Sequence, residues 1–369
     1  LVDWVMDRTT LISRLGIAIT IILALVSLTL KPDERRTEGM PSRAEPVIAL
    51  GKVDKAMGGL EFGYVNVNWD KSIQSDSPDV LRVVSEVDEL LQTEELIGHP
   101  LSIRNLIESL PGGGEGGNRM AMLDLLPPPL KRAFYAPEYR TASVSFRVQD
   151  IGIAKYGPVF ERLQEGLAKI SERNSGFNVE LEESGAVWRF TNLYVIVVDF
   201  LRSLTSAAFI IFIVLSFAYR SLRVGLISII PNLFPLVLSG AFLVVTGQYL
   251  EMVTVCTFIV CLGIAVDDTI HFLTRYQEER RKTDDEQEAI RKAFTGVGTA
   301  LIMTTVVLLA GFATVLFSEN RENRIFGWMG SITIAAALFG DLTFLPALLS
   351  RYDGKSKSEP KPAEAEVAK

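Results

Sequence analysis

Two adjacent acids, Asp267 and Asp268, lie inside an apolar run that begins near Met252. A helix that begins at Met252 has risen roughly 22 Å by Asp267, at about 1.5 Å per residue. That depth lies past the midplane of a hydrocarbon core of about 30 Å. A carboxylate there is costly, so it usually faces a bundle interior or a water path. Burial disfavours its charged form, so it can gain and lose a proton within the cell's range. The chemistry predicted here is proton transfer.

Other polar residues are predicted at a similar depth. His271 follows Asp267 by four residues, so both share one helix face. The same rise per residue places Thr304 and Thr305 of the next span, and Asp341 of the last span, at about the level of Asp267. Together with Asp268 they are the candidate proton relay.

Each candidate also has a purely structural interpretation. Either acid of the pair can hydrogen-bond within the bundle only, and His271 can lie at the interface without a role in transfer. For Asp341, a bond to a neighbouring helix explains the residue as well as proton transfer does. The two threonines are the weakest candidates, because such hydroxyls usually bond back to their own helix.

Six apolar segments are long enough to span a bilayer. They are residues 11–30, 192–219, 224–245, 252–275, 297–317 and 325–349. A signal peptide is the alternative for the first, because Arg14 precedes its apolar run, but a charged stretch and not a small-residue cleavage site follows Leu30. Segment 275–294 is charged and predicted to be an amphipathic helix outside the bilayer, and the tail 351–369 is predicted to be disordered.

Prolines and glycines within these spans are predicted to shape and pack the helices. Pro231 and Pro235 are predicted to kink the third span, and Asn232 to satisfy backbone groups that the prolines leave free. Small residues let helices approach closely. The glycines for which this role is predicted are Gly263, Gly311, Gly327, Gly330 and Gly340.

Residues 31–187 have the composition of an aqueous domain. Strands are predicted at 60–69, 139–148 and 178–182, and helices at 78–91 and 156–170. Segments 111–117 and 127–129 are predicted loops, and His99 a loop residue. Glu182 and Glu183 are expected on a solvated surface. The pattern predicts a small α+β domain.

Basic residues near the helix ends set the orientation. The side expected to be cytoplasmic carries Arg220, Arg223, Arg275, Arg280, Arg281, Lys282, Arg291, Lys292, Arg351 and Lys355. The short loop at 318–324 on the opposite side carries only Arg321 and Arg324. We therefore expect both ends in the cytoplasm and the large domain outside.

Composition narrows the function classes. The 369 residues are 48% hydrophobic and the net charge of −7 does not favour nucleic-acid binding. Cys256 and Cys261 are five apart on a predicted helix, so a disulfide is not expected, and with two histidines they form no metal-ligand spacing. The sequence has no phosphate-binding Walker loop and no nucleophile–base pair, so neither an enzyme nor a cofactor is expected.

Three stretches carry a family resemblance: Gly263-Ile-Ala-Val-Asp267-Asp268-Thr-Ile-His271-Phe, residues 219–235 and residues 340–349. They resemble helices of resistance-nodulation-division (RND) transporters, in the MMPL and hydrophobe/amphiphile efflux branch that is related to Patched and sterol-sensing domains. The resemblance covers about residues 188–350, and elsewhere it rests on layout.

The resemblance implies a six-helix bundle in the cytoplasmic (inner) membrane with a ferredoxin-like, porter-type domain outside. It also implies efflux of a lipid or other hydrophobic compound, driven by protons as the coupling ion. The matching acids of the family carry that coupling, which assigns the role to Asp267 first and to Asp268 second. Because the chain begins with Leu1 and resembles a second half, we expect a fragment or processed form whose partner is the other half or a second copy.

Two rival functions stay open. One is a sterol- or lipid-sensing receptor of the Patched type, which would bind without pumping. The other is a protein-export accessory of the SecD/SecF kind. The acid pair at membrane depth favours pumping over sensing. The outer domain and the Asp-Asp-Thr-Ile-His motif fit the MMPL branch better than they fit the export accessory.

Overall fold

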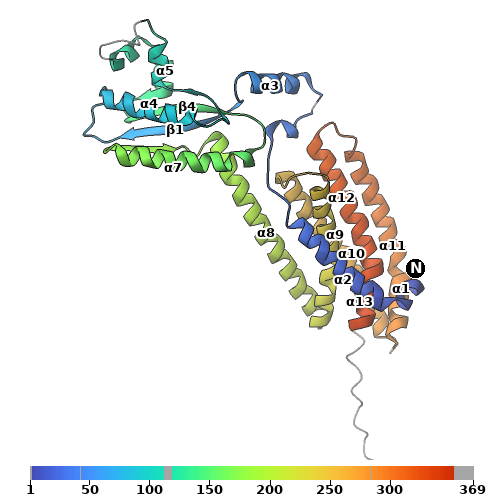
Figure 1. Ribbon diagram of the computed structural model, residues 1–369. Coiled ribbons are helices and arrows are strands. Elements are labelled where there is room, and N and C mark those ends of the chain that lie inside the picture. Colours follow the sequence, from blue (N-terminus) through green and yellow to red (C-terminus); the bar gives the residue numbers. More distant parts are fainter. Residues whose placement is uncertain (1, 42, 112–118, 284, 353–369) are drawn as a thin grey trace, which may run out of the picture. The chain divides into compact units, whose positions relative to one another are not determined.

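The computed structural model describes residues 2–41, 43–111, 119–283 and 285–352. The chain divides into two compact units. Residues 33–195 form the sheet unit, and residues 1–32 with those from 196 onward form the helix unit (Figure 1).

The sheet unit is built on an antiparallel sheet with the strand order β2-β4-β1-β5. The strands are β1 (Glu61–Trp69), β2 (Ile97–Leu101), β4 (Thr141–Val148) and β5 (Phe177–Leu181), and the short β3 (Tyr135–Ala136) pairs with β4. Helix α4 (Pro78–Gln92) connects β1 to β2, and α7 (Gly157–Arg173) connects β4 to β5. Figure 1 shows both helices running alongside the strands, and they also contact each other.

Alternation of apolar residues explains this layer. Val65 and Val67 of β1 are fully buried, and their partners across the ladder, Val144 and Ala142, are buried with them. Successive side chains of a strand point to opposite faces, so one face of the sheet forms the core. The apolar positions of α4 cover this face, as their helical spacing predicts. The predicted strands at 60–69, 139–148 and 178–182 and both predicted helices are confirmed within a few residues.

Several parts of the sheet unit were not predicted. His99 lies in β2 and not in a loop, with a left-handed φ of 39°, and the pairing of β2 shifts register between Gly98 and Leu101. The predicted loop at 127–129 instead begins α6 (Pro128–Phe134), because proline suits the first turn of a helix. Residues 112–117 of the predicted glycine-rich loop lie outside the described residues. Further short helices are α3 (Glu45–Ala56), α5 (Ile103–Glu108), η1 (Arg36–Gly39), η2 (Arg119–Leu125) and η3 (Ile153–Tyr156).

Asp88 on α4 provides a pH prediction for the sheet unit. Its side chain is fully buried, and it accepts a hydrogen bond from Gln92 at 3.0 Å. Burial raises the pKa of Asp88 above its ordinary value, although Arg104, 3.7 Å away, opposes the shift. The folded state therefore binds the proton more tightly than the unfolded state, so stability falls as pH rises from the ordinary carboxyl value through the raised one.

We expect the parent protein to gain thermal stability relative to Asp88→Asn as pH is lowered from neutral towards that window. The physical reason is that protonation removes the cost of the buried charge in the parent, whereas the amide of the variant does not titrate. Melting temperatures of both proteins across the pH series check this. A difference between them that stays constant with pH would contradict it.

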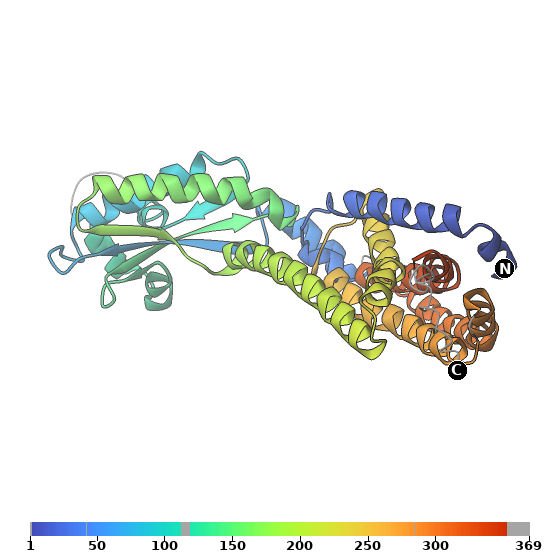
Figure 2. The same ribbon diagram turned by 90° about the horizontal axis from the view of Figure 1, so that it is seen from below.

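Six helices among the described residues are long and apolar enough to cross a membrane. They are α2 (Thr9–Ser27), α8 (Gly185–Ala218), α9 (Leu222–Val245), α10 (Met252–Arg280), α11 (Glu286–Val315) and the composite segment Arg321–Tyr352. The composite segment consists of α12 (Arg321–Phe339), the π-helical turn η4 (Gly340–Phe344) and α13 (Leu345–Tyr352). A short helix α1 (Val2–Asp7) precedes α2, and α9 packs against α2, α10 and α12 (Figure 2).

Helix boundaries differ from the prediction where side chains cap the ends. The predicted amphipathic helix 275–294 is wrong as one element: its first part is the end of α10 and its second part the start of α11. Asp285 explains the break, because its carboxylate accepts hydrogen bonds from the backbone N–H groups of Gln287 and Glu288 at 2.9 and 3.3 Å. Likewise, the predicted tail starts too early, because Arg351 and Tyr352 still belong to α13, and residues 353–369 lie outside the described residues.

Helix α9 continues without a break through Pro231 and Pro235. The Asn232 amide donates to the Ser228 carbonyl at 2.8 Å, whereas the carbonyl that Pro231 leaves free belongs to Ile227. The predicted bond of Asn232 to a carbonyl that a proline leaves free is therefore not seen among the described residues, because its amide bonds to the adjacent carbonyl. The kink itself stays a prediction.

The glycines divide into two groups. A methyl group on Gly340 would lie 3.3 Å from the Pro231 carbonyl oxygen, so this glycine permits close approach of η4 to α9. Gly327 and Gly330 of α12 are similarly tight against α11. A methyl on Gly263 or Gly311 would meet nothing within 4 Å, so the close packing predicted there is not found within this chain.

Gly330→Val is expected to lower the stability of the helix unit by roughly 1–3 kcal/mol, because overpacking forces side chains and backbone to shift. An added Cβ at this position would lie 2.0 Å from the ring of Phe312. The measurement is thermal unfolding in detergent. Gly311→Val is the matched control, since it makes the same change in a neighbouring helix where there is open space. Equal losses in both variants would show that helix propensity and not packing is responsible.

Candidate functional site

Asp341 is the most enclosed of the predicted relay acids. It lies in η4 with 1% of its surface exposed. The Thr269 hydroxyl of α10 donates to its Oδ1 at 2.6 Å and also lies 3.2 Å from Asn232 Oδ1 of α9. Asp341 Oδ2 is buried and has no hydrogen-bond partner among the described residues. Three segments thus meet at one carboxylate that is only half satisfied.

Asp267 and His271 lie on a different face of α10. Their Oδ1 and Nε2 atoms are 3.7 Å apart, as the spacing of four predicts, and their side chains are 71% and 64% exposed in this chain. Both line a groove of about 940 Å³ between α10 and α11. The rest of the groove is mostly apolar, with Thr304 on the opposite wall.

Asp268 lies between these two groups. It lines the same groove, yet only 9% of its surface is exposed. The next residue of α10, Thr269, is the one that donates to Asp341. Its position on α10, one residue from both Asp267 and Thr269, links the groove to the enclosed site.

The two predicted threonines have different environments. Thr304 bonds back to its own helix, at 3.1 Å from the Ala300 carbonyl and 3.0 Å from that of Leu301. Thr305 is 2% exposed, and its hydroxyl is buried without a hydrogen-bond partner among the described residues. Thr305 therefore belongs to the bundle interior, whereas Thr304 belongs to the groove wall.

Sequence reasoning missed Thr269. The predicted relay contains acids, a histidine and the threonines of another span, but not the hydroxyl next to Asp268. Asn232 was assigned only a role toward the backbone, although its side-chain oxygen also faces Thr269. The signal that could have indicated Thr269 is its position on the helix. Consecutive residues of α10 point in different directions, so a residue next to Asp268 can face a different neighbouring helix.

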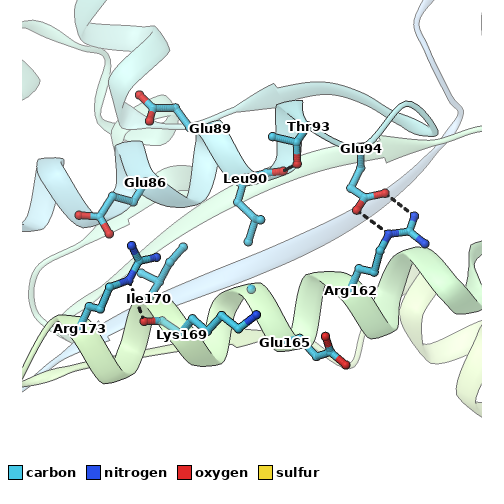
Figure 3. A pocket seen from close by; sticks show the side chains of 11 residues that line it. Glu86, Glu89, Leu90, Thr93, Glu94, Arg162, Glu165, Lys169, Ile170 and Arg173 are labelled. Carbon is cyan, nitrogen blue, oxygen red and sulfur yellow. Dashed lines mark hydrogen bonds and ion pairs between the residues drawn. The ribbon is translucent and has the colours of Figure 1, made fainter.

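The sheet unit contains a second hollow, of about 600 Å³, between α4 and α7. Figure 3 shows charged residues of both signs around it. Arg162 donates to both carboxylate oxygens of Glu94, at 2.9 and 2.6 Å, and Arg173 donates to the Lys169 carbonyl at 3.2 Å. Glu182, outside this hollow, accepts from Asn66 at 3.0 Å. Among the described residues no group of three or more potential metal ligands was found. The candidate site is therefore the acid cluster of the helix unit.

Comparison with known proteins gives a family match within the helix unit. Residues 197–366 match the model of the MMPL family. The chain is therefore a member of the RND/MMPL superfamily over this part of its length, and its six apolar helices make it a multi-pass membrane protein.

Particular relatives match over part of their length. A hopanoid transporter, HpnN of Burkholderia multivorans, is 29% identical over 152 residues, which are 40% of this chain and 17% of the relative. A putative membrane protein of Methanocaldococcus jannaschii, MJ1562, is 29% identical over 139 residues, or 38% of this chain and 36% of the relative. The sulfolipid-1 exporter MmpL8 of Mycobacterium tuberculosis is 26% identical over 88 residues, which are 24% of this chain and 8% of the relative. These matches span 36% of the Methanocaldococcus jannaschii protein and only 17% and 8% of the other two relatives.

Proposed function

We propose that this chain is part of a proton-driven transporter of a lipid or other hydrophobic compound. The domain match and the relatives named as hopanoid and sulfolipid transporters support the substrate class. The observation that carries the proton coupling is Asp341, a carboxylate inside an apolar bundle with one oxygen unsatisfied. A buried carboxylate of this kind is much less costly when it holds a proton.

The proposed relay has an entrance and an end. Asp267 and His271 exchange protons in the groove, Asp268 passes them inward, and Asp341 holds them beside Thr269. A neutral Asp341 attracts the Thr269 hydroxyl less strongly, so that hydroxyl turns to Asn232, 3.2 Å away on α9. Protonation thereby exchanges a bond between α10 and η4 for one between α10 and α9. A proton that crosses about 100 mV supplies roughly 2.3 kcal/mol for this exchange. The proton is the only coupling ion proposed.

The sheet unit is proposed to be a ferredoxin-like porter module outside the inner membrane, where it receives the substrate. The support is its two strand–helix–strand repeats and its strand order. The excess of basic residues at one set of helix ends supports cytoplasmic termini.

A second bundle, from the other half of the transporter or a second copy, is the proposed partner of α10 and α11. On these helices Asp267 and His271 are exposed, and a methyl group added to Gly263 or Gly311 would meet nothing within 4 Å. A titratable pair in lipid would be costly, and a partner bundle would shield it. Small residues suit such contact.

The proposal is tested in four strains, with membrane levels of the protein checked: parent, deletion, Asp267→Asn and Asp268→Asn. Lipids and hydrophobic compounds are profiled in the inner membrane and outside it. We expect both variants to reproduce the accumulation seen in the deletion, and the accumulating compound identifies the substrate. If the deletion changes the profile while both variants resemble the parent, the proton relay is wrong and lipid sensing becomes the better explanation.

A further inference from the structure

A separate hollow of about 530 Å³ lies between the turn that connects α8 to α9 and the end of α10. The turn contributes Tyr219, Arg220 and Ser221, and α10 and the residue after it contribute Arg280 and Arg281. It is distinct from the groove of Asp267, because the two share no lining residue.

Hydrogen bonds fix the two walls of this hollow. The Tyr219 hydroxyl lies 3.1 Å from the Ile270 carbonyl and 3.1 Å from the Thr274 hydroxyl, both on α10. In return, Gln277 of α10 donates to the Tyr219 carbonyl at 3.3 Å. Tyr276, which also lines the hollow, is only 2% exposed. The turn is therefore held against α10, so the hollow has a defined shape.

Arginines are the charged residues among the described lining residues of the hollow. Three guanidinium groups line it, and among its described lining residues none carries a carboxylate. The nearby acid Glu279 is engaged elsewhere, at 2.8 Å from Arg275 and 2.9 Å from Lys282. Arg280 donates to the Thr283 carbonyl at 3.0 Å, which holds one guanidinium in position. The like charges of Arg220 and Arg281 at one space favour an anion between them.

We propose that this hollow binds a phosphate group. The planar donors of arginine match phosphate oxygens, and hydroxyl and amide groups from Ser221 and Gln277 line the same space. The hollow lies where α8 ends and α9 begins, next to two apolar helices. Basic pockets at such helix ends suit the headgroup of an anionic phospholipid. Free phosphate offers the same chemistry, so the experiment separates the two sources.

The test uses the full protein purified in detergent. Arg220→Gln combined with Arg281→Gln removes two of the three charges and leaves Arg280, which bonds to the backbone. The control combines Arg291→Gln with Lys292→Gln on α11, which removes the same charge from exposed positions outside the hollow. Bound phosphatidylglycerol and phosphatidylcholine are counted by native mass spectrometry, and inorganic phosphate is titrated while melting temperature is followed.

Parent and control are expected to retain phosphatidylglycerol over phosphatidylcholine, and the double variant to bind it roughly 30-fold more weakly. Inorganic phosphate could instead raise the melting temperature of parent and control only, with no preference for either lipid. That result would also support the phosphate site and would identify its ligand as free phosphate and not a lipid headgroup. Phosphatidylglycerol and phosphate binding that are unchanged in the double variant, or weakened equally in the control, would overturn the proposal. If the double variant does not fold, Arg281→Gln alone is tested, and its affinity for phosphatidylglycerol is expected to fall about fivefold.

Discussion

Asp341→Asn is expected to remove proton-driven transport while leaving the protein in the membrane at its normal level. Asparagine keeps the shape and can still accept from Thr269, but it cannot exchange a proton. Uncoupling from about 100 mV withdraws roughly 2.3 kcal/mol per proton, so the gradient of substrate that can be maintained falls roughly 50-fold. The measurement is transport into or out of proteoliposomes under an imposed proton gradient, with the lipid that accumulates in the deletion strain as substrate.

Thr269→Val separates the acid from its hydrogen-bond partner. It keeps Asp341 and a side chain of similar shape but removes the hydroxyl that bridges towards Asn232. We expect this variant to transport more slowly than the parent and to remain dependent on the proton gradient, whereas Asp341→Asn loses that dependence. Transport by Asp341→Asn that still responds to the gradient would exclude Asp341 from the relay.

The second large effect is expected at Arg189 in the sheet unit. Its guanidinium pairs with Glu61 at the start of β1, and both side chains are nearly buried, at 12% and 11% exposure. Arg189 also donates to the Glu34 carbonyl at 3.3 Å. Removing one partner of such a pair leaves an uncompensated charge, which costs roughly 3–5 kcal/mol. Arg189→Leu should therefore lower the melting temperature of the sheet unit by about 10 °C.

A double-mutant cycle isolates the ion pair from the loss of packing. Glu61→Leu is expected to be strongly destabilising by itself, and the combination of Arg189→Leu with Glu61→Leu is expected to be milder than the sum of the two. The exposed pair Asp79 and Arg82 of α4, 3.1 Å apart in the same unit, gives the comparison, because surface pairs contribute about 1 kcal/mol or less. Additive losses at Arg189 and Glu61 would show that the pair contributes no coupling.

Much of the architecture could be predicted from periodicity. Length and hydropathy identify the six spans, since a bilayer admits few alternatives. Boundaries were less predictable because they depend on single capping groups. Asp285 ends the interhelical turn with its carboxylate, whereas the charge pattern on either side continues without a change.

For the candidate site, the common level of the Asp268 region and Asp341 was predictable, and the direction in which the side chains point only in part. The spacing of four correctly pairs Asp267 with His271. It does not say which face of α10 its neighbours cover, so the sequence could not show that Asp268 and Thr269 turn inward while Asp267 faces the groove. Helix packing decides this, through contacts with α9 and η4 that are distant in sequence.

The π turn at Gly340–Phe344 has a consequence for the last span. One extra residue in a turn rotates the helix before it by about 100° relative to the helix after it. α12 and α13 therefore present their faces independently, and Asp341 lies at the joint between them. If the turn tightened to ordinary α-helical bonding, one half of the span would have to swivel against the other. In the proposed relay, a proton taken up at Asp341 would act at the point where such a swivel begins, between the two halves of that span.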